Sequence, residues 1–90
     1  MTIQATTEIY SGGYCPYCSR AKALLKKKGA PFTEYDVQAD PKHREAMMAR
    51  TNNARTIPQI FINGQHIGGC DELYALDKKG ELDPLLQTTA

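Results

Sequence analysis

The sequence has no tryptophan, only two phenylalanines, and no apolar stretch near the ~20 residues that a membrane-spanning helix needs. Its start, Met1 to Thr7, lacks the basic and apolar segments of a secretory signal. Charge is nearly balanced, with 11 Lys and Arg residues against 10 Asp and Glu residues, and no run of about five like charges occurs. We therefore expect a cytoplasmic protein that binds neither nucleic acid nor a membrane.

Cysteine is scarce, and an odd number of cysteines cannot all be paired in disulfides within one chain. With three cysteines in 90 residues, Cys70 cannot belong to an even disulfide framework. In a reducing compartment, a single Cys-x-x-Cys is more often redox-active or metal-binding than a structural cross-link. The length allows one small domain, residues 1–90, so we expect any ligand site to be a surface groove.

Two of the cysteines lie close together in the stretch Cys15-Pro16-Tyr17-Cys18. On a helix this spacing puts both sulfurs on one face, where they can close a reversible disulfide. Proline is favoured at the first helical position, so Pro16 predicts Cys15 at the N-cap and Cys18 in the first turn. The free N–H groups and the positive dipole end there favour a Cys15 thiolate, which is a nucleophile.

The hydrophobic pattern predicts alternating strands and helices, followed by a hairpin. Asn63-Gly64 predicts the tight turn of that hairpin, and the resulting order β-α-β-α-β-β-α implies a mixed four-stranded sheet covered by helices. The expected strands are 7–10, 32–37, 59–62 and 65–67, and the expected helices are 16–28, 41–50, 71–79 and 82–87. Met47 and Met48 are the expected core contacts of the second helix.

A zinc site is the other common use of Cys-x-x-Cys. Zinc takes four ligands, usually as two close pairs, and Cys70, His43 and His66 are not paired at such a spacing. We therefore expect no metal. Both histidines are expected to be solvated or packed side chains, and Cys70 to be a small residue near a helix start.

Three motifs together resemble the dithiol glutaredoxins, especially the short bacterial ones. They are Cys15-Pro16-Tyr17-Cys18, Thr56-Ile57-Pro58-Gln59 and Gly68-Gly69-Cys70-Asp71, and the resemblance runs from about Glu8 to Leu86. It implies an α/β, thioredoxin-like fold with helices on both faces of the sheet. It also implies a glutathione-dependent thiol-disulfide oxidoreductase that reduces protein disulfides and glutathione mixed disulfides, with glutathione as co-substrate and no tightly bound cofactor.

The resemblance also implies roles for individual residues. Cys15 matches the nucleophile and Cys18 the resolving thiol, while Pro58 matches a proline that follows a cis peptide bond. In the family, a helix start holds the γ-glutamyl carboxylate, and an acidic side chain matching Asp71 holds the neighbouring amino group. The implied glutathione-binding residues are Tyr17, Arg55, Thr56, Ile57, Pro58, Gly69, Cys70 and Asp71. Asp71 has the alternative role of a helix cap.

One position departs from the family pattern. A lysine commonly precedes the nucleophilic cysteine by three residues, and this chain has Gly12 there. Arg55 and Gln38 are the remaining candidates for the glycyl carboxylate of glutathione. A lysine at position 12 should favour the Cys15 thiolate, unless Gly12 has a positive φ.

Two other functions are alternatives, and the residues between the cysteines disfavour both. An iron–sulfur carrier of this family usually has glycine or serine in place of Pro16. A thioredoxin typically has Trp-Cys-Gly-Pro-Cys. The expected partners are glutathione and disulfide-containing or glutathionylated proteins, with ribonucleotide reductase as one family possibility. We expect a monomer.

Overall fold

The computed structural model describes residues 2–89, and a mixed four-stranded sheet forms its centre. The sheet consists of β2 (Thr7–Ser11), β3 (Phe32–Asp36), β4 (Gln59–Ile62) and β5 (Gln65–Gly68), in the order β3-β2-β4-β5. β2 is parallel to β3 and antiparallel to β4, and β4 is antiparallel to β5. The predicted mixed sheet is therefore confirmed.

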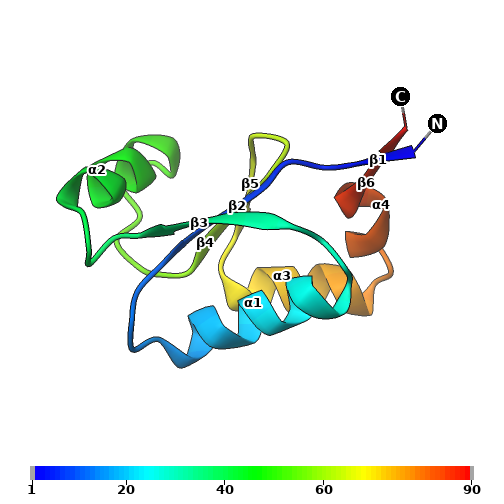
Figure 1. Cartoon of the computed structure of the whole chain (residues 1–90), viewed down its shortest axis with the longest axis horizontal. Coiled ribbons are helices and arrows are strands. Elements are labelled where there is room, and N and C mark those ends of the chain that lie inside the picture. Colours follow the sequence, from blue (N-terminus) through cyan, green and yellow to red (C-terminus); the bar gives the residue numbers. More distant parts are fainter. Residues whose placement is uncertain (1, 90) are drawn as a thin grey trace.

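Helices cover both faces of this sheet, as predicted. Figure 1 shows α1 (Pro16–Lys27) and α3 (Cys70–Lys78) side by side on one face and α2 (Pro41–Arg50) on the other. Successive residues of a strand point to opposite faces, so neighbours join different cores. Ile9 and Ile60 pack in the α1/α3 core, whereas Tyr10 and Phe61 pack in the core beneath α2.

The turn residues have the predicted conformations. Asn63 and Gly64 have φ values of 53° and 79°, as the tight β4–β5 turn requires. Asn52 and Asn53, at φ values of 58° and 69°, follow the end of α2.

Within residues 2–89, no helix is long and apolar enough to cross a membrane.

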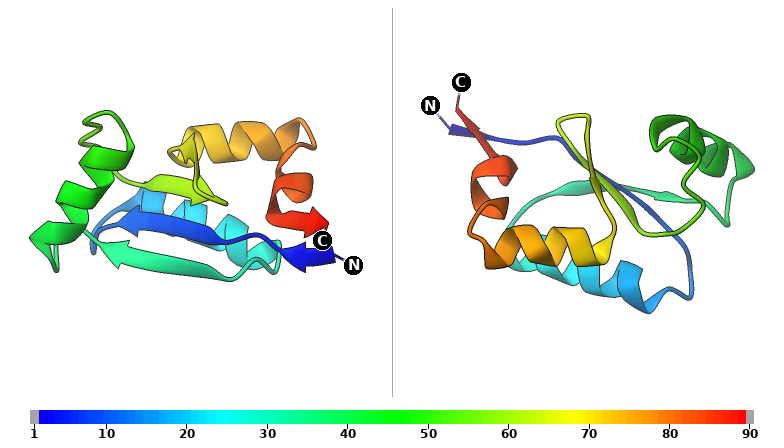
Figure 2. Two further views of the ribbon diagram at one scale, coloured as in Figure 1. Left: turned by 90° about the horizontal axis from the view of Figure 1, so that it is seen from above. Right: turned by 180° about the vertical axis from the view of Figure 1, so that it is seen from behind.

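A small second sheet was not predicted. β1 (Thr2–Gln4) pairs antiparallel with β6 (Gln87–Thr89), from opposite ends of the chain, and both lie beyond one end of the central sheet in Figure 2. The last helix, α4 (Leu82–Leu86), therefore ends before Gln87, which we had expected to be helical. The strand conformation of Gln87 depends on a partner more than 80 residues away in the sequence, which a local pattern cannot reveal.

Burial along β3 and α2 differs from a simple alternating pattern. On β3, an edge strand, Thr33 is exposed although it shares a strand face with the half-buried Tyr35. Met47 is fully buried, whereas Met48 is only half-buried. The alternating pattern identified the strand correctly but could not show how far the helices extend over the edge of the sheet.

Candidate functional site

The two paired cysteines lie at the start of α1. Cys15 is the N-cap residue, as predicted, and its Sγ accepts a hydrogen bond from the Cys18 N–H at 3.1 Å. The two cysteines form a disulfide. Cys15 is half-buried, whereas Cys18 is only 1% exposed. A molecule arriving from solvent can therefore reach the Cys15 sulfur but not the Cys18 sulfur.

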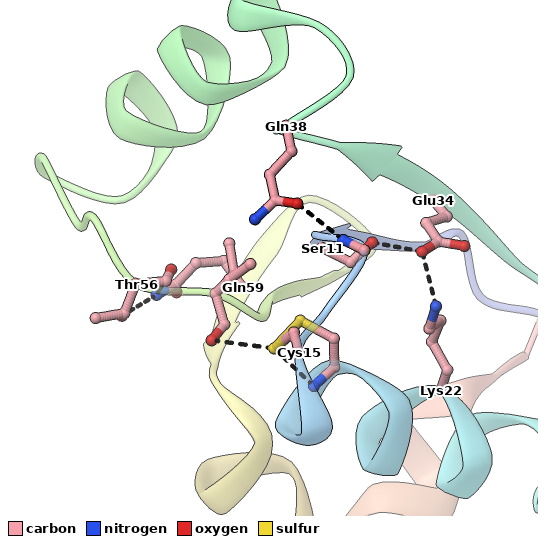
Figure 3. The surroundings of a disulfide bond; sticks show 10 residues. Ser11, Cys15, Lys22, Glu34, Gln38, Thr56 and Gln59 are labelled. Atoms are coloured by element: carbon pink, nitrogen blue, oxygen red, sulfur yellow. Dashed lines mark hydrogen bonds and ion pairs between the residues drawn. A yellow bond between two sulfur atoms is a disulfide. The ribbon is translucent and has the colours of Figure 1, made fainter.

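The segment before β4 lies against this disulfide. The peptide bond between Ile57 and Pro58 is cis, in agreement with the expectation from the family resemblance. The Ile57 carbonyl oxygen lies 3.9 Å from Cys15 Sγ (Figure 3). In the disulfide this sulfur carries no hydrogen, so the contact is close packing of polar atoms rather than a hydrogen bond.

A surface groove of about 350 Å³ lies beside the cysteines. Of the eight residues predicted to bind glutathione, all except Arg55 line it, and Gln59 and Glu72 line it in addition. The predicted residues in the groove are Tyr17, Thr56, Ile57, Pro58, Gly69, Cys70 and Asp71. Segments far apart in the sequence thus meet around one groove, which agrees with the expectation of a surface site.

The start of α3 forms one wall of the groove. Gly69 is the N-cap residue, and its N–H donates to the Glu72 carboxylate at 2.7 Å. Glu72, which sequence reasoning missed, therefore takes the helix-capping role that Asp71 had as an alternative. Asp71 is exposed in the first turn, and within residues 2–89 its carboxylate makes no side-chain hydrogen bond or salt bridge. A negative charge at this lining position can attract an amino group.

Close approach of two backbones explains the glycine before α3. A Cβ atom on Gly69 would lie 3.3 Å from the Pro58 carbonyl oxygen, tighter than an ordinary van der Waals contact. Gly69 therefore lets the start of α3 approach the segment that carries the cis proline.

Cys70 differs from Cys15 although both lie at a helix start. It is only 5% exposed, and burial raises the pKa of its thiol above the ordinary value; Arg20 opposes this shift, and Asp71 and Glu72 add to it. The thiol form is favoured, so the structure supports the interpretation of Cys70 as a small packing residue rather than a reactive sulfur.

A polar network that joins β2, β3 and α1 was not predicted. Ser11, at the end of β2, donates a hydrogen bond to Glu34 on β3, and Lys22 on α1 lies 2.9 Å from the same carboxylate oxygen (Figure 3). The hydroxyl of Ser11, followed by the ammonium of Lys22, lowers the pKa of Glu34 below its ordinary value. The three residues belong to separate elements, so no local sequence pattern could have indicated their contact.

Gly12, in the loop that leads to the cysteines, packs closely against Gln38, which follows β3. The Gln38 side-chain oxygen accepts a hydrogen bond from the Gly13 N–H at 3.1 Å. Gly12 is buried, and a Cβ atom on it would lie 2.8 Å from Ile57 Cδ1 and 3.0 Å from Gln38 Cδ. Gly12 does not have a positive φ, so the anticipated backbone obstacle to a lysine is absent. The obstacle is steric, because Gln38 and Ile57 fill the space beside Gly12.

The two histidines take part in packing, in agreement with the prediction. His66 lies 2.6 Å from the Gln59 side-chain oxygen and stacks on Phe61, and the His43 ring lies 5.3 Å from the Tyr35 ring. Among residues 2–89, no three His, Cys, Asp or Glu side chains gather as a metal site would require.

Comparison with known proteins links this geometry to one family. A sequence model of the glutaredoxin family matches residues 7–67, which include both paired cysteines and Pro58. The chain is 57% identical over 88 residues to a probable glutaredoxin of Synechocystis sp., covering 98% of this chain and 100% of that protein. It is 55% identical over 83 residues to glutaredoxin 3 of Escherichia coli, covering 92% of this chain and 99% of that protein.

Solved structures show the same likeness. The crystal structure of a buckwheat glutaredoxin–glutathione complex matches with a TM-score of 0.82 and 34% identity, covering 91% of this chain and 76% of that one. The solution structure of glutaredoxin from Brucella melitensis matches with a TM-score of 0.79 and 52% identity, covering 92% of this chain and 89% of that one. The thioredoxin-like architecture is therefore shared with these proteins.

Proposed function

Because this chain belongs to the glutaredoxin family of glutathione-dependent thiol-disulfide oxidoreductases, we propose that Cys15 is its attacking sulfur and Cys18 its resolving sulfur. The observation that carries these roles is the difference in exposure. Cys15 is half-buried next to Ile57, which lines the groove, whereas Cys18 is 1% exposed and within bonding distance of Cys15 alone among residues 2–89. An incoming disulfide therefore meets Cys15 first.

The start of α1 prepares the Cys15 sulfur for attack. In the reduced protein, the Cys18 N–H that now lies 3.1 Å from Cys15 Sγ would donate to a thiolate at the positive end of the helix dipole. No charged side chain is needed for this interaction, which compensates in part for Gly12 in place of the family lysine. The half-buried position leaves one side of the sulfur open to substrate.

The reaction proceeds by two thiol–disulfide exchanges. The Cys15 thiolate attacks one sulfur of a disulfide, a bond forms between the two sulfurs, and the other sulfur leaves as a thiolate that takes up a proton. The Cys18 thiolate then attacks Cys15 Sγ, forms the Cys15–Cys18 disulfide and releases the second substrate thiolate. Two glutathione molecules restore both thiols and leave as oxidised glutathione. When the substrate is a glutathione mixed disulfide, a second glutathione can resolve the Cys15 adduct directly.

The groove is the proposed place for glutathione. Its γ-glutamyl carboxylate would accept hydrogen bonds from the N–H groups of Cys70 and Asp71 at the start of α3, with the Asp71 carboxylate on the amino group. The Ile57 backbone would pair with the extended peptide, and Tyr17, Thr56, Pro58 and Gly69 would line its path. The exposed carboxylate of Asp71 and the shared groove support this placement. The buckwheat relative, whose structure is a glutathione complex, supports it as well.

The glycyl carboxylate of glutathione is the remaining charged group of the ligand. Arg55 does not line the groove, and the Gln38 side-chain oxygen is held by the Gly13 N–H. We propose that Arg55, the residue before Thr56 in the groove wall, contributes a long-range attraction rather than a direct contact. That attraction would be weakened by solvent and salt.

The remaining proposals concern the setting of the enzyme. We propose that residues 1–90 form one domain that acts as a monomer in the cytoplasm, where reduced glutathione is available. Its protein substrates would be disulfide-containing or glutathionylated proteins, with ribonucleotide reductase as a candidate from the family, and it would need no tightly bound cofactor or metal.

A coupled assay with glutathione, glutathione reductase and NADPH tests the proposed roles. With the mixed disulfide of glutathione and cysteamine as substrate, Cys15→Ser should abolish turnover and Cys18→Ser should retain it, because glutathione can replace the resolving thiol. With a protein disulfide as substrate, both variants should be inactive. Equal loss in both variants on the mixed disulfide would contradict the roles.

Two further observations would indicate a different function. Turnover only with a flavoenzyme donor would indicate a thioredoxin, and visible absorbance of the fresh protein would indicate an iron–sulfur carrier.

A further inference from the structure

The loop around Cys15 carries an aromatic side chain, Tyr14, that has no packing partner in the part of the chain that the structure describes. Tyr14 is 100% exposed, and Tyr17 is 55% exposed, whereas Tyr10 is only 3% exposed. Burial of a tyrosine ring normally contributes to stability, so a fully exposed ring gives up that contribution. Tyrosine is also one of the residue types that dominate binding energy at protein interfaces. An exposed Tyr14 beside the reactive sulfur therefore points to binding.

The two tyrosines lie on different parts of the site. Tyr17 lines the groove proposed for glutathione, whereas Tyr14 does not. Around them, residues 10–19 contain no charged side chain, in a chain in which 23% of the residues are charged. The stretch itself therefore offers a partner no charged side chain. Contact with an aromatic ring and with backbone groups is the recognition that the loop offers.

The chemistry brings a polypeptide to this loop. During attack on a glutathionylated protein, Cys15 Sγ forms a bond of ~2 Å with the glutathione sulfur while the protein sulfur leaves on the far side. Glutathione then occupies the groove, so the protein that carries the leaving sulfur must lie outside it. Consecutive Cα atoms are ~3.8 Å apart, so Tyr14 is within side-chain reach of that departing sulfur.

We propose that Tyr14 is a specificity-determining residue that binds the polypeptide part of the substrate, next to its disulfide-bonded cysteine. This inference rests on the proposed function. The phenol ring lies against apolar side chains that flank the substrate cysteine, and its hydroxyl group bonds to their backbone. A small disulfide has no such flanking residues and gains nothing from Tyr14.

The test compares two substrates in three proteins. Wild type, Tyr14→Ala and Tyr14→Phe are assayed with the mixed disulfide of glutathione and cysteamine, and with a glutathionylated ten-residue peptide whose central cysteine has apolar neighbours. For Tyr14→Ala we expect a roughly fivefold to thirtyfold lower kcat/KM on the peptide and an unchanged value on the small substrate. Tyr14→Phe keeps the ring and should recover most of the peptide activity.

A second arm separates this inference from the proposed function. The three proteins are reduced in advance, and the rate of a single turnover is measured on an intermolecular disulfide of the same peptide, without glutathione. The same Tyr14 dependence should appear even if glutathione proves to be the wrong electron donor, in which case only the coupled assay fails.

Three results would overturn the inference. Equal losses of activity on the peptide and the small substrate would mean that Tyr14 acts on the loop or on Cys15. Unchanged activity on both would mean that the ring contacts no substrate. A wild-type dimer that Tyr14→Ala dissociates in sedimentation experiments would assign the ring to contact between two copies of this chain.

Discussion

Adding one methyl group at position 12 would test how the loop before the cysteines is held. In Gly12→Ala the new carbon would lie 2.8 Å from Ile57 Cδ1 and 3.0 Å from Gln38 Cδ, inside the ~3.5–4.0 Å of favourable contact. Both obstructing atoms belong to side chains that can move. Alanine adds no charge, so it isolates the steric effect that would also accompany a lysine.

The expected cost follows from the two neighbours. Overpacking of a buried site typically costs about 1–3 kcal/mol. If Gln38 moves aside, the Gly13 N–H also loses its hydrogen bond of 3.1 Å, a loss of about 1 kcal/mol. Because the obstructing groups are flexible, part of the strain relaxes, and we expect the free energy of unfolding to fall by about 1–3 kcal/mol. For a chain of this size, Tm should fall by roughly 4–8 °C for each kcal/mol.

A double-mutant cycle assigns the effect to Gln38. Urea unfolding of wild type, Gly12→Ala, Gln38→Ala and the double variant gives the coupling free energy. Gln38→Ala alone should cost about 1 kcal/mol through the lost Gly13 hydrogen bond. In the double variant the smaller side chain at position 38 leaves room for the methyl group. The double variant should therefore lose less stability than the sum of the losses in the two single variants.

Additive costs would show that Gln38 does not obstruct position 12, and Ile57 would then remain as the obstacle. A Gly12→Ala protein as stable as wild type would refute the steric explanation altogether. In that case a lysine at position 12 should fit without strain and should favour the Cys15 thiolate.

Two further predictions concern charged side chains. Asp71→Asn should raise the KM for glutathione roughly three- to thirtyfold at unchanged Tm, because a charge-assisted contact is lost. The exposed control Glu45→Gln should change neither the KM nor the Tm. An unchanged KM in Asp71→Asn would remove Asp71 from the binding site. Arg50 donates to Glu8 at 2.9 Å and lies over the Phe61 ring at 3.9 Å, so Arg50→Met should cost about 1–3 kcal/mol near neutral pH. Its hydrogen bond lowers the pKa of Glu8, so this stabilisation is present above the ordinary value of 4.5 and is lost as pH falls below it. The difference in stability between the two proteins should shrink in acid to the part that comes from the Phe61 contact, and a constant difference across that range would contradict the ion pair.

Local patterns were enough to place the helices and the central sheet. The strands and helices depend on periodic burial and on turn residues such as Asn63 and Gly64, which act over a few positions. Proline at the first helical position likewise predicted that Cys15 would cap α1. These effects arise between sequence neighbours, so they can be predicted before any tertiary contact is known.

Contacts between distant segments could not be predicted in this way. The network of Ser11, Glu34 and Lys22 joins three elements, and no residue of the three indicates its partners by itself. The capping role of Glu72 and the exclusion of Arg55 from the groove also depend on how α3 meets the segment before β4. These contacts depend on which side chains the folded chain brings together and on the space left between them.

Short-range patterns in the sequence were enough to predict the order of elements between Thr7 and Leu86, the helix-capping cysteine and the family of the protein, because each depends on residues within a short stretch or on a matching motif. Only the tertiary structure decided what surrounds that cysteine. It filled the space beside Gly12 with Gln38 and Ile57, and it left Tyr14 without a packing partner among residues 2–89. Packing of segments distant in sequence sets the free volume at each position, and free volume decides which side chains are held and which remain available to a substrate.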